Sequence, residues 1–220
     1  SKYLKKLRVG VLGRLAGVAL FAANINVRYL QATAMTEPML LFTMTAGCYY
    51  LMRWHDNDQI IELVKAAFWI MLSTLTRYDG RFLLAYATGL IMIQVWRKHG
   101  LKRVEGVTVM FLTLAALGVV IWLGWNLLIF GDALYFALGP FSAHAQQLVM
   151  ESAGALPTKG NFWLSTKIYW YALLYNSYTY PAILALIGLI VLSRDKLLSL
   201  SIRLSTSSLL SPLFFNILAL

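Results

Sequence analysis

The sequence predicts an all-α protein, a polytopic transmembrane bundle of about seven spans that forms one domain over residues 1–220. Its composition is the first reason: 60% of the residues are hydrophobic, 13% are charged and the mean hydropathy is +0.68. A soluble domain has about a quarter charged residues. The second reason is that apolar runs of 15 to 27 residues recur along the chain, close to the roughly 20 residues that a membrane-spanning helix needs.

Seven apolar segments are predicted to be spans, and they lie at 9–27, 38–54, 60–75, 82–96, 104–130, 168–192 and 197–220. Four polar clusters interrupt them, at 24–38, 76–81, 131–132 and 140–167. The longest connection, 131–166, is expected to be a structured outer loop, because long connections in compact proteins usually have a function. The chain begins on a basic stretch without Met and ends inside an apolar run, so we expect it to be part of a longer polypeptide.

The basic residues predict the orientation of the bundle. Cytoplasmic loops of membrane proteins are enriched in Lys and Arg. With the N-terminus in the cytoplasm, eleven basic residues fall inside: Lys2, Lys5, Lys6, Arg8, Arg53, Arg97, Lys98, Lys102, Arg103, Arg194 and Lys196. Five fall outside: Arg28, Arg77, Arg81, Lys159 and Lys167. All four polar clusters then lie at the outer face, which is how an intramembrane active site is built. The same bias explains the net charge of +10, so nucleic acid is not an expected partner.

The cluster at 24–38 supports two interpretations. Thr36 before Glu37 and Pro38 is typical of a helix start, with a hydroxyl N-cap, an acid in the first turn and Pro near its first position. Alternatively, Glu37 binds a ligand at the mouth of the bundle. Arg28 has no obvious local partner and either anchors to lipid headgroups or joins a site.

The cluster at 76–81 joins two predicted spans by a short turn and contains Arg77, Tyr78, Asp79 and Arg81. The simpler interpretation is an Arg–Asp ion pair that closes a helical hairpin. The functional one is a basic pocket for a lipid phosphate, because the planar guanidinium donates bidentately to phosphate oxygens.

The other two clusters lie in and before the outer loop. Gly131 is predicted to end a helix, with Asp132 starting the loop, and Ser142 to cap a short helix. The loop offers His144, Gln147 and Lys159 among many aromatic residues, which suit either an interfacial aromatic belt or contacts to a sugar.

Several classes of site are absent from the sequence. Cys48 has no second cysteine to pair with, and the histidines at 55, 99 and 144 are scattered over both predicted faces. There is no Gly-rich phosphate loop, and no cofactor site can be recognised. A divalent metal remains compatible with the acids of the outer face.

The clusters together resemble a known family. The segments YLQATAMTEP (29–38), LTRYDG (75–80) and WNLLIFGDALYF (125–136) occur in this order. They are similar to polytopic glycosyltransferases of the GT-C superfamily, in particular the protein mannosyltransferase-like and aminoarabinose transferase-like group of bacteria and archaea. The similarity covers roughly residues 24–165.

The resemblance implies a polyprenyl-phosphate-linked sugar donor and transfer at the outer face of a prokaryotic plasma membrane. Arg28, Arg77, Arg81 and Lys159 would then neutralise the donor phosphate. Tyr78, His144 and Gln147 would contact sugar or acceptor. Glu37, Asp79 and Asp132 are the acids available to orient the acceptor or a metal and to remove the acceptor's proton.

In that family the presumed general base is an acidic residue in the first outer loop, after the first span. The first outer loop of this chain, 24–38, contains no Asp, so the resemblance implies that the family's first span and acidic loop are missing here. The base therefore cannot be carried over. A non-catalytic membrane subunit of a larger complex is the main alternative. A transporter is a weaker one, since Arg14, Lys65 and Arg203 alone approach mid-membrane depth.

Overall fold

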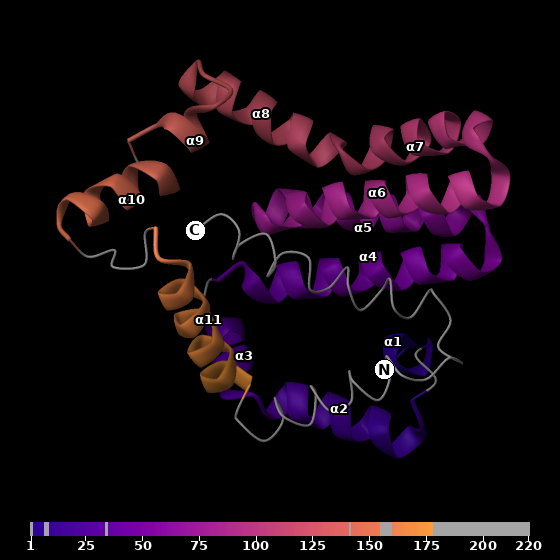
Figure 1. Cartoon of the computed structure of the whole chain (residues 1–220), viewed down its shortest axis with the longest axis horizontal. Helices are drawn as coiled ribbons and strands as arrows, with labels where there is room; N and C mark the ends of the chain where they lie inside the picture. The colour runs from indigo at the N-terminus through magenta and orange to yellow at the C-terminus, as the bar shows by residue number, and fades with distance from the viewer. Residues whose placement is uncertain (1, 7–8, 34, 141, 155–159, 178–220) are drawn as a thin grey trace.

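The computed structural model of the chain describes residues 2–6, 9–33, 35–140, 142–154 and 160–177. These residues form helices joined by short connections and contain no strand. Four helices lie side by side in the centre (Figure 1): α4 (Glu37–Asn57), α5 (Ile60–Thr76), α6 (Asp79–His99) and α7 (Leu101–Ala115). The predicted all-α class is therefore confirmed.

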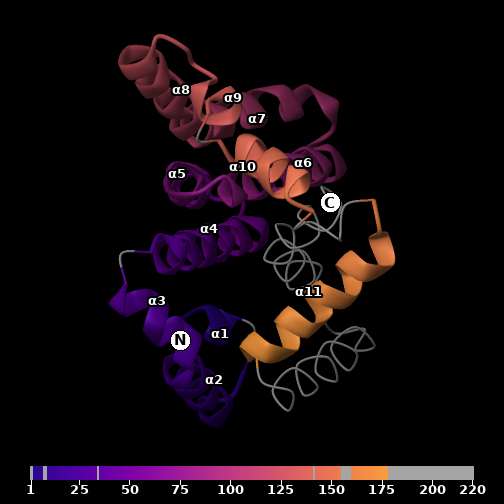
Figure 2. The ribbon, with the colours of Figure 1, turned by 90° about the vertical axis from the view of Figure 1, so that its left-hand side faces the viewer.

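The remaining helices flank this bundle. At the N-terminal side they are α1 (Lys2–Lys6), α2 (Val11–Ala23) and α3 (Ile25–Ala32). After α7 they are α8 (Leu117–Phe130), α9 (Tyr135–Leu138), α10 (Ala143–Ser152) and α11 (Phe162–Ser177). Figure 2, turned by 90°, shows α2 and α3 on the far side of α4 from α5 and α6.

Two of the predicted spans are broken in the structure. The segment 9–27 divides into α2 and α3, bent by 56°, because Asn24 starts a new helix by accepting a hydrogen bond from Val27 N through Oδ1 at 3.1 Å. The segment 104–130 divides into α7 and α8, bent by 43°. Hydropathy alone does not show the break between α7 and α8, because the residues on both sides of it are apolar.

Within the described ranges, no helix taken singly combines the length and the apolar character needed to cross a membrane, and the two bent pairs α2–α3 and α7–α8 do so when each is taken together. The predicted spans 38–54, 60–75 and 82–96 coincide with α4, α5 and α6. Helix α11 covers the start of 168–192, and the rest of that segment and 197–220 lie outside the described residues.

Helix α5 is the centre of the packing, with contacts to α4, α6, α7 and α8. Ala66 and Ile70 on α5 are fully buried, as are Cys48 on α4 and Leu83 on α6. In water, burial of apolar side chains such as these stabilises a fold by roughly 25 cal/mol per Å² of apolar area removed from the solvent.

Two glycines allow backbones to approach α5 closely. A Cβ at Gly80 in α6 would lie 2.6 Å from Thr74 N and nearer still to the Ser73 carbonyl group. A Cβ at Gly118 in α8 would lie 2.6 Å from Met71 O. Only glycine therefore permits these crossings, in which small residues bring helices together.

Local signals define most helix ends as the sequence predicts. Helix α4 begins at Glu37, with Pro38 in its first turn, although the Thr36 side chain forms no capping hydrogen bond. Gly131 ends α8 in the left-handed region at φ 70°. Ser142 caps α10 by accepting a hydrogen bond from Ala145 N at 3.1 Å.

Candidate functional site

One end of the bundle collects the polar clusters. Helices α4 and α6 begin there, and α5 and α8 end there, because short connections reverse the chain between successive helices. Glu37 is therefore brought next to the turn that contains Arg77 and Asp79, although it lies 40 residues earlier in the chain. Antiparallel helix packing is what converts separate sequence clusters into one site.

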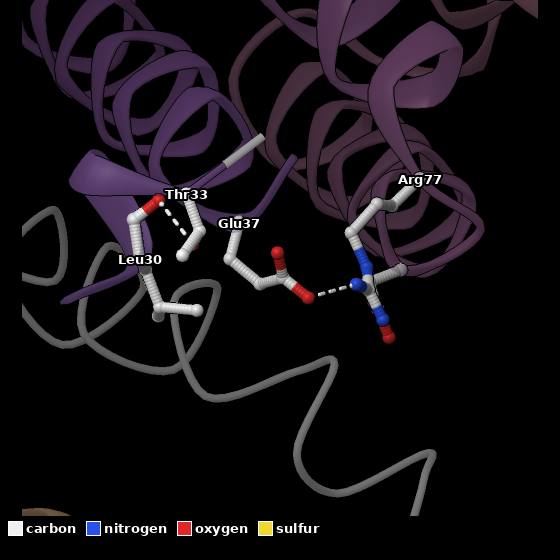
Figure 3. Close-up of polar contacts among 5 residues, drawn as sticks. Leu30, Thr33, Glu37 and Arg77 are labelled. Carbon is white, nitrogen blue, oxygen red and sulfur yellow. Dashed lines mark hydrogen bonds and ion pairs between the residues drawn. The ribbon is translucent and has the colours of Figure 1, made fainter. Parts of the chain in front are cut away.

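Arg77 is the hub of an ion-pair triad at this end. Its Nη1 donates to Glu37 Oε1, and its Nε donates to Asp79 Oδ2 at 3.1 Å. Figure 3 shows Glu37 pointing from α4 toward Arg77. The predicted Arg–Asp pair of the hairpin is thus confirmed, and Glu37 extends it to a third helix. Two carboxylates on one guanidinium leave the triad with a net charge of −1, so Arg77 has no uncompensated charge to offer a ligand.

A cavity of about 340 Å³ lies beside the triad. It is lined by residues from the end of α5, the following turn, the first turn of α6 and α8: Thr74, Leu75, Thr76, Arg77, Tyr78, Arg81 and Trp122. Two nitrogen atoms of its lining, Arg81 Nε and Trp122 Nε1, are buried and have no hydrogen-bond partner. Buried donors without partners are costly, so these two atoms indicate a place for an acceptor group.

The Arg81 guanidinium lies against two aromatic rings. Its Cζ lies 4.9 Å from the centroid of the Tyr78 ring and 4.8 Å from that of Phe136. The two rings are stacked, with centroids 5.6 Å apart. Phe136 belongs to α9, so the segment that follows α8 folds back onto Arg81, and the ring contacts orient its side chain.

Sequence reasoning missed Trp122 and the role of Phe136. Trp122 lies inside an apolar run, where an indole can contact lipid as readily as it can donate to a bound ligand. One signal was present: Asn126 follows one helical turn later, and its side-chain nitrogen donates to Trp122 O at 2.8 Å. A buried amide and an indole on one helix stripe indicate a polar face within an apolar helix.

Other predicted site residues do not line this cavity. Arg28 is exposed on α3, and His144 and Gln147 are exposed on α10. Asp132 is exposed and accepts a hydrogen bond from Leu134 N at 2.8 Å, which shapes the turn after α8. Lys159 lies outside the described residues. Of the described arginines expected to neutralise a donor phosphate, Arg77 and Arg81 line this cavity and Arg28 does not.

The acids do not assemble a metal centre in the described part of the chain, where no group of three or more His, Cys, Asp or Glu side chains is arranged to hold a metal ion. Glu37 and Asp79 are instead both oriented by Arg77. Glu37 Oε2 is buried and has no hydrogen-bond partner, and Glu37 itself does not line the cavity but contacts it through Arg77.

The comparisons with known proteins assign no relative. No family model, no curated protein and no solved structure matches the chain. The resemblance of the three sequence segments to GT-C glycosyltransferases therefore stays a prediction.

Proposed function

We propose that this chain is the membrane part of a GT-C-type glycosyltransferase, which uses a polyprenyl-phosphate-linked sugar at the extracytoplasmic face of a prokaryotic plasma membrane. One observation carries the proposal. The cavity at the polar end of the bundle presents a cation, Arg81, and two buried donors without partners, Arg81 Nε and Trp122 Nε1. A phosphate group supplies the negative charge and the several acceptor oxygens that these groups require.

Sugar transfer requires that the negative charge on the leaving phosphate be stabilised and that the proton of the acceptor be removed. The bond between the sugar C1 and the phosphate oxygen breaks, and the electron pair leaves with the lipid phosphate. Arg81 stabilises that developing charge. The acceptor oxygen forms the new bond to C1 and releases its proton to a carboxylate. Glu37 is the candidate, since its Oε2 is free of hydrogen bonds and its Oε1 is held by Arg77.

Exposed apolar side chains support the membrane setting. Leu12 on α2 is 83% exposed and Leu128 on α8 is 84% exposed, and large apolar side chains are exposed on every long helix of the bundle. Soluble monomers rarely expose continuous apolar surface on this scale. Lipid chains would cover it, and the α2–α3 and α7–α8 pairs are the candidates to span.

A second candidate, a non-catalytic membrane subunit, is favoured by a different observation. Glu37 and Asp79 are both ion-paired with Arg77. These contacts join α4, the turn after α5 and the start of α6. A chain whose acids serve to join helices could scaffold a complex without transferring sugar.

Binding of a lipid phosphate separates these candidates. We expect the purified chain in detergent to bind undecaprenyl phosphate and not undecaprenol, which lacks the phosphate. Arg81→Ala should weaken binding by about tenfold to a hundredfold, the range for a lost charged hydrogen bond. Arg81→Lys should restore part of it, because a point charge cannot reproduce the fork.

The matched control is Arg28→Ala, which removes an exposed arginine that does not line the cavity and should leave binding within about twofold. Equal binding of undecaprenol, or equal losses in Arg28→Ala and Arg81→Ala, would contradict the phosphate site and favour the scaffold.

A further inference from the structure

A second cavity lies at the opposite end of the bundle. It has a volume of about 560 Å³ and is formed where α4 and α6 end and where α5 and α7 begin. The cavity is lined by both apolar and basic side chains, among them Leu63, Val95, His99, Lys102, Arg103 and Met110. Neither the triad of Arg77 nor the cavity of Arg81 contributes to this place.

The basic side chains of this cavity are not matched by acids. Lys102 and Arg103 form no ion pair with any carboxylate in the described ranges. Asp58 also lines the cavity, but its two carboxylate oxygens each lie 3.1 Å from Lys98 Nζ, so its charge is already compensated. His99 adds ring nitrogens at the rim. The cavity mouth therefore carries a net positive charge.

The inner wall is apolar. Leu63 and Val95 are 1% exposed, and together with Met110 they form the interior side of the cavity. Gly106 also lines it, and a Cβ built there would have nothing within 4 Å. A cationic rim above an apolar wall selects a ligand that has an anionic head and a hydrocarbon part.

We propose that this cavity binds the headgroup of an anionic phospholipid, with Lys102 and Arg103 on the phosphate and the glycerol–acyl region against Leu63, Val95 and Met110. Basic pockets between helices are a known way to hold such headgroups. A soluble phosphate shares the anionic chemistry, but it would leave the apolar wall uncovered. The proposal is independent of sugar transfer, because it uses other residues at the other end of the bundle.

The test is a titration of the purified full chain in detergent, followed by native mass spectrometry. The probes are phosphatidylglycerol, phosphatidylcholine and glycerol phosphate. We expect one saturable phosphatidylglycerol site, with clearly weaker binding of the other two. Lys102→Gln with Arg103→Gln should weaken it by about thirtyfold, from the loss of two cation contacts to the phosphate.

Two further variants keep the result interpretable. Gly106→Leu fills the cavity without changing any charge and should weaken binding as well. Lys2→Gln with Lys5→Gln removes two exposed charges from α1, which does not line the cavity, and should leave the affinity within about twofold.

Three outcomes would overturn the proposal. They are an equal loss in the α1 control, equal affinity for phosphatidylcholine, and glycerol phosphate binding as tightly as phosphatidylglycerol. The last outcome would assign the site to a soluble phosphate.

Discussion

Replacing Gly80 by Ala is expected to disturb both the packing and the anion site. Gly80 lies in the first turn of α6, directly on the last turns of α5. Its absent side chain lets the two backbones touch, with the position of a Cβ 2.6 Å from Thr74 N. Ordinary contacts between such atoms are about 3.5–4.0 Å. The first turn of α6 would therefore have to move by about 1 Å.

The cost follows from what the new methyl group meets. Its neighbours are backbone atoms of Ser73 and Thr74, so no flexible side chain can move aside. Overpacking of this kind costs about 1–3 kcal/mol, and we expect the upper end of that range. Arg81 is the next residue, and a shift of its helix turn would also separate it from the rings of Tyr78 and Phe136. Undecaprenyl phosphate binding should fall together with stability.

Gly89 in the same helix is the matched control, because a Cβ there has nothing within 4 Å. Gly89→Ala should be neutral or stabilise by up to about 1 kcal/mol, since alanine is the better helix former. Unfolding monitored by tryptophan fluorescence in detergent gives both values. If Gly80→Ala is as stable as Gly89→Ala, the close crossing of α5 and α6 is wrong, and with it the placement of Arg81.

Two other predictions concern the opposite end and the orientation. The carboxylate of Glu62 is 3% exposed and lies 2.9 Å from Arg53 Nη2. We expect Arg53→Met to destabilise the chain more than Glu62→Gln, by about 1 kcal/mol or more. The reason is that Arg53→Met leaves the buried Glu62 carboxylate with Lys65 alone, whose Nζ lies 3.6 Å away. The reverse order in denaturant unfolding would contradict this prediction. Single cysteines in a Cys48→Ala background should be labelled from outside at Met150 and not at Gly100, and the opposite pattern would invert the proposed topology.

The sequence predicted those features that have local causes. Glu37 with Pro38 marks a helix start, Gly131 a helix end and Ser142 a cap, and each is found where expected. The Arg77–Asp79 ion pair could also be predicted from the sequence, because the two residues are two positions apart in one turn. These signals depend on the chemistry of a few neighbouring residues, which the sequence displays directly.

The remainder depends on packing between distant segments. Nothing local joins Glu37 to Arg77, or places Phe136 of α9 on the ring of Tyr78. The bend between α2 and α3 was missed because the predicted span 9–27 was carried past Asn24, which caps a new helix close to the end of that segment. Nothing local joins Glu62 to Arg53 of the preceding helix either, and the structure buries the Glu62 carboxylate against it.

The distribution of unmatched cations links the two proposed sites. At one end, Arg77 is compensated by two acids while Arg81 is not; at the other, Arg53 and Lys98 have acidic partners while Lys102 and Arg103 do not. Compensated cations connect helices and so fix the bundle. Arg81 lines one cavity together with Arg77 of the first ion-pair group. Lys102 and Arg103 line the other together with Asp58, which pairs with Lys98. Anionic ligands that bind these cations in the folded chain, and not in the unfolded chain, would stabilise both ends. Undecaprenyl phosphate and phosphatidylglycerol should therefore each raise the unfolding temperature, and their effects should add because the sites share no residue.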